Sequence, residues 1–305
     1  MDEQKEPFIL PEINNEFIPI ENDLFNTAYR KKIVAPVEEL RFLDFKQIDF
    51  GNQTNIGLVL DKEVVHVESF QIKAGTTKKQ VDSLGEFGID HQAMLKSTLL
   101  NESTISTTKS LINLYDNLGK DHVQSNLTKR QLFLQKWINL SFPTYVTDGI
   151  DIARKIMLYS NLIAASCRRG AGNFVIVSSK IHSLLCDSPA YLSNQMDKLV
   201  VSNGSVYLNG TIGSIKVFVD PYATADHLII GRSLNNLNDP EPGVVFLEYV
   251  RKFDTGEMTN GDIVQTLLSR HAIKAIGKVE SARANYYTAD LVFKKRPYWR
   301  KLLNV

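Results

Sequence analysis

The stretch that decides the fold begins with Cys167-Arg-Arg-Gly-Ala-Gly-Asn-Phe-Val-Ile-Val-Ser-Ser179 and ends at Val250. Its first part places a helix end, broken by glycines, before an apolar strand. A bent pair of strands around Val219-Asp-Pro-Tyr222 follows, and then Gly231-Arg232 and a loop rich in Asn, Asp and Pro. No cluster of catalytic side chains lies in this stretch. The order of elements predicts a mixed sheet packed with helices.

The glycines of Gly170-Ala171-Gly172 resemble half of a dinucleotide-binding fingerprint. They follow a helix and precede a strand, which is the reverse of the phosphate-binding order, and the third glycine is missing. A helix C-terminal cap is the better interpretation. Arg168 and Arg169 then lie near the negative end of the helix dipole, which is a structural role.

The composition of the 305 residues is that of a globular protein, with 43% hydrophobic and 23% charged residues and a net charge of +1. The cysteines at 167 and 186 form no CxxC pair, and no two histidines have the spacing of a helical metal site. Asp220 precedes Pro221 and Tyr222, which favours a turn over a catalytic carboxylate. We therefore expect no catalytic residue, no bound metal and no cofactor. The six histidines are His66, His91, His122, His182, His227 and His271.

Targeting and membrane signals are also lacking. No basic segment followed by an apolar run opens the chain, so we expect no signal peptide. No apolar stretch approaches 18 residues, so we expect no membrane span.

The charge is distributed unevenly between the two ends. Residues 1–25 hold seven acids and one lysine, whereas residues 294–301 hold five basic residues and no acid. The basic cluster begins with Lys294, Lys295 and Arg296 and includes Tyr298 and Trp299. Docking on a neighbouring subunit, solvation, and contact with nucleic acid remain open as its role.

Residues 1–47 read as an extended arm interrupted by prolines. The arm is too apolar for a free disordered tail, so we expect it to lie on a surface of its own domain or of a neighbour. The apolar residues that carry this expectation are Phe8, Ile9, Phe17, Ile18 and Phe25.

Residues 48–82 alternate in the manner of strands, and a turn at Asp61-Lys62-Glu63 would join them into a long hairpin. Residues 89–118 predict a long helix capped by Asp90 and ended by Gly119. Its polar centre indicates that it leans on a sheet. Residues 148–167 predict a second helix, capped by Thr147 or Asp148.

The remaining elements are shorter. We expect a buried strand at 174–178, a short helix at 179–185, and strands at 200–209 and 212–219 that meet at Asn209-Gly210. Two further strands are expected at 227–231 and 244–250, and mostly strand or mixed structure over 262–279.

Three passages together resemble the major capsid protein of tailed bacteriophages, which has the HK97-like fold, and most closely its T-even-type branch. The first is Ser69-Phe-Gln-Ile72 followed by the helix from Ile89. The second is Ile152-Ala-Arg154 through Arg169-Gly-Ala-Gly-Asn-Phe-Val-Ile-Val-Ser178. The third is Val217-Phe-Val-Asp-Pro-Tyr222, Ile230-Gly-Arg232 and Gly243-Val-Val-Phe246.

The resemblance implies an α+β HK97-like capsid fold. Its parts would be an N-terminal arm (1–47), an E-loop hairpin (48–82), and a peripheral P-domain with a spine helix (83–166 and 248–305). A mixed α/β axial A-domain would occupy 167–247.

The resemblance also implies a function without catalysis. Copies would form pentamers and hexamers of an icosahedral phage head that encloses the DNA genome, in the virion, after assembly in the host cytoplasm. Portal, scaffold and decoration or other minor capsid proteins would be partners, packaged DNA would touch the inner face, and no membrane would be involved. The expected assembly residues are Phe8, Ile9, Phe17, Ile18, Phe25, Asp61, Lys62, Arg168, Arg169, Arg232, Lys294, Lys295 and Arg296.

Two related roles remain as alternatives. One is an encapsulin-like nanocompartment shell that encloses cargo enzymes. The other is a minor vertex capsid protein of the same fold.

Overall fold

The computed structural model describes residues 18, 20, 22–50, 53–88, 90–126, 144–193, 206–233, 241–257 and 263–293. Within these residues the fold is α+β, as predicted from the sequence. The elements are η1 (Asp23–Thr27), β1 (Tyr29–Lys32), β2 (Val37–Phe50), β3 (Gln53–His66), β4 (Glu68–Thr76), α1 (Lys78–Glu86), α2 (His91–Ser125), β5 (Thr144–Val146), α4 (Gly149–Cys167), β6 (Phe174–Ser178), α5 (Ser179–Leu185), β7 (Tyr191–Ser193), β8 (Tyr207–Ile212), β9 (Ile215–Asp220), β10 (His227–Gly231), β11 (Gly243–Glu257), β12 (Ile263–Ile276), α6 (Val279–Arg283) and β13 (Tyr286–Phe293).

A seven-stranded sheet forms one body of the molecule, with strand order β5-β13-β10-β6-β9-β8-β7. Its central strand β6 is fully buried, which explains its unbroken apolar sequence. Helices α4 and α5 pack on one face through residues such as Ile156 and Ile181. The other face is covered by η1 and α2 through Phe25 and Tyr115. The sheet is therefore the middle layer between two apolar cores.

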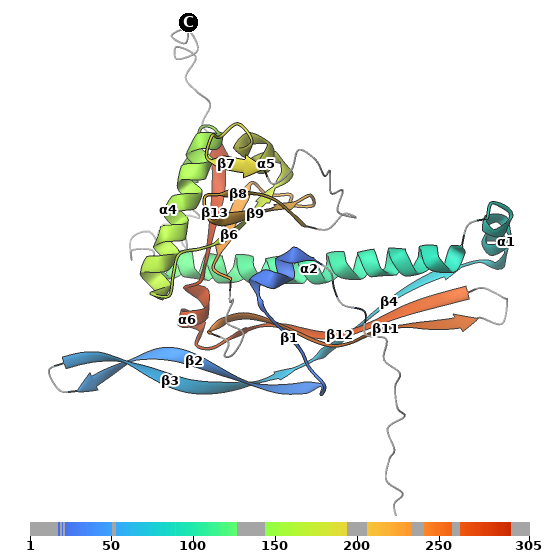
Figure 1. Ribbon diagram of the computed structural model, residues 1–305, viewed down its shortest axis with the longest axis horizontal. Coiled ribbons are helices and arrows are strands. Elements are labelled where there is room, and N and C mark those ends of the chain that lie inside the picture. The colour runs from blue at the N-terminus through green and yellow to red at the C-terminus, as the bar shows by residue number, and fades with distance from the viewer. Residues whose placement is uncertain are drawn as a thin grey trace, which may run out of the picture.

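A four-stranded sheet, β1-β11-β12-β4, forms the second body. The long helix α2 runs along both sheets, and the four-stranded sheet lies beneath it in Figure 1. The polar centre of α2 lies against the four-stranded sheet, and its side chains Ser103, Thr107 and Thr108 are buried there. The prediction that this helix leans on a sheet is therefore confirmed.

Strands β2 and β3 form a separate two-stranded ribbon that projects beyond the rest of the molecule (Figure 1). The predicted turn at Asp61-Lys62-Glu63 is wrong, because β3 runs unbroken through these residues, which pair with Phe42, Arg41 and Leu40 of β2. Three consecutive charged residues in a strand resemble a turn in sequence. The ribbon starts at Val37, and β4 belongs to the four-stranded sheet instead.

The two predicted long helices are present with the predicted N-terminal caps. Asp90 accepts hydrogen bonds from the backbone of α2, and Asp148 accepts one from Asp151 N–H of α4. The predicted end of the first helix at Gly119 is wrong, since α2 continues to Ser125. Gly119 is needed for a close approach: a Cβ there would lie 2.3 Å from Oγ1 of Thr288.

The strand pair around residue 210 also differs from expectation. Asn209 and Gly210 lie inside β8, where the pairing with β9 shifts register. The turn falls at Gly213, which has a φ of +60° that glycine tolerates. Gly210 instead allows close packing, because a Cβ would lie 2.5 Å from the carbonyl oxygen of Leu192.

The predicted domain limits cross continuous elements. β2 spans the limit at 47/48, and β11 spans the limit at 247/248. Helix α4, placed in the peripheral domain, packs on β6, β9 and β10 of the axial domain. The division into arm, hairpin and two domains therefore stays a prediction.

Candidate assembly surfaces

The base of the β2–β3 ribbon is fixed to its own chain. Leu40, Phe42 and Val65 are buried against residues of β11 and β12. Glu63 adds polar anchors, since its carboxylate lies 2.7 Å from Lys274 Nζ and accepts a hydrogen bond of 3.2 Å from Gly277 N–H. The ribbon is therefore held firmly at one end.

The opposite face of the ribbon is open. Leu60 is 58% exposed and Val64 is 47% exposed. The register pairs Leu60 of β3 with Leu43 of β2. An isolated two-stranded hairpin is marginally stable in water, so an open apolar face of this kind indicates a missing partner surface.

The two charged residues expected at the tip of the hairpin lie instead along β3. Lys62 Nζ is 3.6 Å from a carboxylate oxygen of Glu39, and both side chains are exposed. Asp61 is partly buried and pairs in register with Phe42. The tip of the ribbon at residues 51 and 52 lies outside the described residues.

Part of the expected arm lies on its own domain. Phe25 is fully buried, with its ring centroid 4.6 Å from that of Phe246. Ile18 is partly buried, and its N–H donates a hydrogen bond of 3.4 Å to the carbonyl of Arg251. Phe25 is therefore a core residue and is not free to contact a neighbour. Phe8, Ile9, Phe17, Lys294, Lys295 and Arg296 lie outside the described residues.

Glu248 holds this segment through its carboxylate, a contact that was not identified from the sequence. Its carboxylate lies 2.9 Å from Arg30 Nη2 and accepts a hydrogen bond of 3.4 Å from Ile20 N–H. The pairing of β11 with β12 shifts register between Glu248 and Val250. A glutamate in an apolar strand signals a buried partner, although the sequence does not reveal which one.

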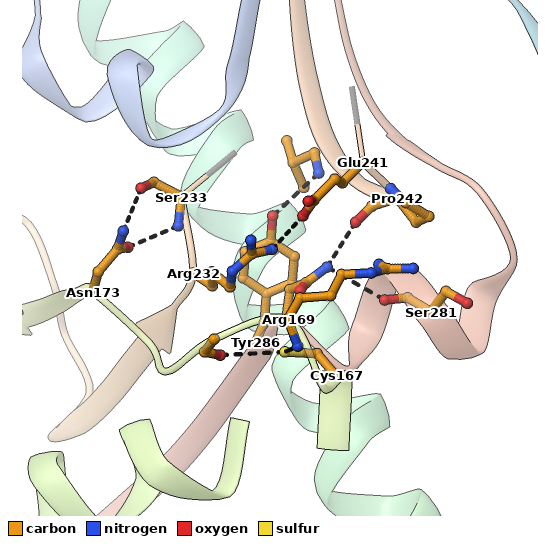
Figure 2. Close-up of polar contacts among 12 residues, drawn as sticks. Cys167, Arg169, Asn173, Arg232, Ser233, Glu241, Pro242, Ser281 and Tyr286 are labelled. Atoms are coloured by element: carbon orange, nitrogen blue, oxygen red, sulfur yellow. Dashed lines mark hydrogen bonds and ion pairs between the residues drawn. The ribbon is translucent and has the colours of Figure 1, made fainter. Parts of the chain in front are cut away.

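Two of the three arginines near the glycine turn, Arg169 and Arg232, contact other residues of the same chain (Figure 2). Arg168 ends α4 in a left-handed conformation, with φ 56°, and its side chain is exposed. Arg169 N–H donates to Cys167 Sγ at 3.4 Å. Arg232 Nη1 donates to a carboxylate oxygen of Glu241 at 2.5 Å and so links the two ends of the loop 233–241.

The same turn is tied to the neighbouring strands by amide side chains. Figure 2 shows Asn173 exchanging two hydrogen bonds with Ser233, of 2.6 and 2.8 Å. Asn285 Nδ2 donates to the carbonyl of Pro242 at 2.7 Å. The glycines follow the end of α4 at Cys167 and precede β6, and Gly172 is closely packed, because a Cβ there would lie 3.1 Å from side-chain atoms of Ile163 and Ile230.

Two buried polar side chains, Arg251 of β11 and His271 of β12, lie in the four-stranded sheet near α2. Arg251 Nη2 donates to the carbonyl of Leu100 at 3.2 Å, in the middle of α2. Burial lowers the pKa of Arg251 to about 10, against the opposing effect of Glu248. Burial, helped by the charge of Arg251, lowers the pKa of His271 to about 4. With a pKa of about 4, His271 is neutral at pH 7, and its ring stacks on that of Phe70.

The described residues also bear on two other classes of site, a metal site and a membrane-spanning segment. They hold no group of three or more His, Cys, Asp or Glu side chains arranged to bind a metal ion. No described helix is both long and apolar enough to cross a membrane.

A projecting ribbon, a long helix across two sheets and a mixed sheet define the HK97-like fold, and solved phage structures share this fold. A chain of Microbacterium phage Oxtober96 has a TM-score of 0.52 and 9% identity, covering 94% of this chain and 95% of that chain. A chain of Mycobacterium phage Cain has a TM-score of 0.51 and 7% identity, covering 97% and 96%.

The family follows from the sequence comparison. A model described as Major capsid protein Gp23 matches residues 13–302, and the chain belongs to this family. The chain is 25% identical over 214 residues to the major capsid protein of Vibrio phage KVP40. That match covers 63% of this chain and 39% of the relative, so the chain spans about two fifths of its length. These matches do not favour the nanocompartment or minor vertex alternatives.

Proposed function

We propose that copies of this chain assemble into a closed icosahedral phage shell that encloses packaged DNA. Rings of five and six subunits would form through head-to-tail contacts. Each contact is modest, but several contacts per subunit act together, because the first makes the others effectively intramolecular. No bond is made or broken by the subunit, so its role is structural and not enzymatic.

The observation that carries this proposal is the projecting β2–β3 ribbon. Its base is buried on its own chain, whereas Leu60 and Val64 of its open face are exposed. Apolar area removed from water stabilises by about 25 cal/mol per Å², so a neighbouring copy that covers this face gains free energy. The ribbon would thus reach over an adjacent subunit.

The finer assignments rest on the family. Portal, scaffold and decoration proteins are proposed partners, and packaged DNA is proposed to touch the inner face without sequence preference. Assembly in the cytoplasm of the host and residence in the virion belong to the same proposal. The peripheral domain, the axial domain and the arm are proposed to divide the contacts among neighbours.

The test is a pair of substitutions on the two faces of β3. Leu60→Asp places a charge on the open face, and we expect a folded subunit that no longer forms shells. Val65→Asp places a charge in the buried base, and we expect loss of folding instead. Circular dichroism and electron microscopy separate the two effects. Normal shells from the Leu60→Asp subunit would contradict the proposed role of the ribbon.

A further inference from the structure

Helix α4 is apolar on both of its faces. Ile152, Ile156 and Ile163 on the inner face are fully buried against the seven-stranded sheet. The outer face nevertheless carries four large apolar side chains that are 40–49% exposed. Four large apolar side chains gathered on one exposed face of a helix indicate a missing partner. The α4 outer face comprises Ile150, Arg154, Met157, Leu158 and Leu162, and α4 lies at the outer side of its sheet in Figure 1.

A second exposed apolar patch lies on the opposite face of the same sheet. Tyr145 of β5 is 50% exposed and pairs in register with Val292 of β13, which is 41% exposed. Their neighbours Val146 and Leu291 are buried in the core beneath α4. Because side chains alternate along a strand, Tyr145 and Val292 lie on the face away from α4.

This patch is open because α2 covers only the beginning of β13. Gly119 of α2 packs on Thr288, four residues before Val292. Asp290 lies between these two positions, on the same face of the strand, and is exposed. The sheet-end patch therefore comprises Tyr145, Asp290 and Val292.

The two surfaces are complementary in charge as well as apolar. Arg154 is exposed within the α4 outer face, and Asp290 is exposed within the sheet-end patch. By helical spacing, Asp151 and Lys155 lie beside the α4 outer face and are partly buried, and His227 of β10 pairs in register with Asp290. Within the described part of the chain, neither Arg154 nor Asp290 forms an ion pair with another residue. An arginine of one copy can therefore meet an aspartate of another.

We propose that the α4 outer face of one copy docks on the sheet-end patch of the next copy, with Arg154 paired to Asp290. This inference rests on the proposed shell function and names one of its subunit contacts. The two surfaces lie on opposite faces of one sheet, so the contact is head-to-tail. Head-to-tail contacts close into rings when the rotation between copies allows it.

The test is a charge exchange in the full chain. Arg154→Asp and Asp290→Arg each place like charges across the contact, which opposes docking. We expect each single variant to reduce the assembled fraction at fixed concentration by at least about tenfold. The double variant Arg154→Asp/Asp290→Arg restores opposite charges and is expected to recover most of the assembly. Sedimentation velocity at low salt measures the assembled fraction.

Two controls isolate the contact. Asp121→Arg changes an exposed acid of α2 by the same charge and is expected to assemble as the unaltered chain does. Thermal unfolding of each variant checks the fold, and we expect little change because both positions are exposed. Leu158→Asp, which needs no charge partner, is expected to reduce assembly in both the unaltered chain and the double variant.

The outcomes of this test distinguish the proposed contact from the proposed shell function. Shells from both single variants, in normal yield, would overturn the contact and leave the shell function standing. Loss in the single variants without recovery in the double variant would overturn the pairing of Arg154 with Asp290. An unaltered chain that forms no shells under any condition would remove the proposed function and this contact together.

Discussion

Arg30 and Glu248 form an ion pair of 2.9 Å that joins β1 to β11, and the Glu248 side chain is only 8% exposed. Arg30 Nη2 also donates to the carbonyl of Ile20 at 3.0 Å, so the pair holds the chain before η1 as well. β1 runs parallel to β11, with Arg30 in register with Phe246. The pair therefore fixes the N-terminal segment to the four-stranded sheet.

Glu248→Gln tests this anchor. The substitution removes the charge while Arg30 stays partly buried, and we expect a loss of about 1–3 kcal/mol in the free energy of unfolding. Urea unfolding at pH 7 measures it. Glu39→Gln, at the exposed Lys62 pair, is the matched control and is expected to change stability by less than about 0.5 kcal/mol. Equal effects at both positions would argue against a buried anchor.

The pH dependence of stability follows from His271. Its pKa is about 4 in the folded chain and 6.5 in the reference state, so the unfolded chain binds more protons between these values. Stability is therefore complete above about pH 6.5 and falls as the pH drops towards 4. The contribution of this group is about 3 kcal/mol at most. Burial lowers the pKa of His122 and His182 as well, which adds loss in the same direction.

His271→Gln should flatten this dependence, and urea unfolding at pH 4.5, 5.5 and 7.5 measures the slope. His66→Gln removes an exposed histidine and is expected to leave the slope unchanged. A slope that persists unchanged in the His271→Gln chain would show that other groups account for the loss of stability in acid.

Two glycines in helices, Gly119 and Gly85, provide a test of packing. Gly119→Ala places a methyl group 2.3 Å from Oγ1 of Thr288 and 2.7 Å from its backbone nitrogen. We expect destabilisation of about 1–3 kcal/mol, despite the better helix propensity of alanine. Gly85→Ala in α1 meets no atom within 4 Å and is expected to stabilise by up to about 1 kcal/mol. Denaturant midpoints compare the two, and a stabilised Gly119→Ala chain would refute the close packing of α2 on β13.

The sequence predicted the class of fold and most elements because their signals are local. Asp90 and Asp148 cap helices through their own side chains, and the apolar run of β6 marks a buried strand. The errors occur where residues distant in the sequence determine where an element ends or how it pairs. Gly119 resembles a helix stop in the sequence, but in the structure it allows α2 to pack closely on Thr288. Asp61-Lys62-Glu63 resembles a turn, but in the structure it is a strand segment that pairs with β2.

The candidate site was harder to predict for the same reason. Arg232 is among the assembly residues expected from the sequence, whereas in the structure it pairs with Glu241 of its own chain, a contact that depends on how the loop closes. Phe25 looked like a residue for a neighbour and is instead a core residue of its own chain. Whether an apolar arm residue faces its own domain or another copy is a tertiary property, which composition and periodicity do not contain.

Two N-terminal truncations test whether the buried segment around Phe25 stabilises the fold. Removal of residues 1–17 keeps Ile20, Leu24 and Phe25, which are all buried, so we expect an unchanged free energy of unfolding. Removal of residues 1–25 deletes these side chains, and we expect a loss of several kcal/mol. Guanidinium unfolding of both chains measures the difference. Equal stability of the two truncated chains would contradict the packing of this segment.

Electron microscopy of the purified full chain over a range of concentrations tests the central claim most directly. Self-assembly through head-to-tail contacts predicts closed particles with subunits grouped in fives and sixes. A chain that stays monomeric at every concentration and ionic strength would contradict the account.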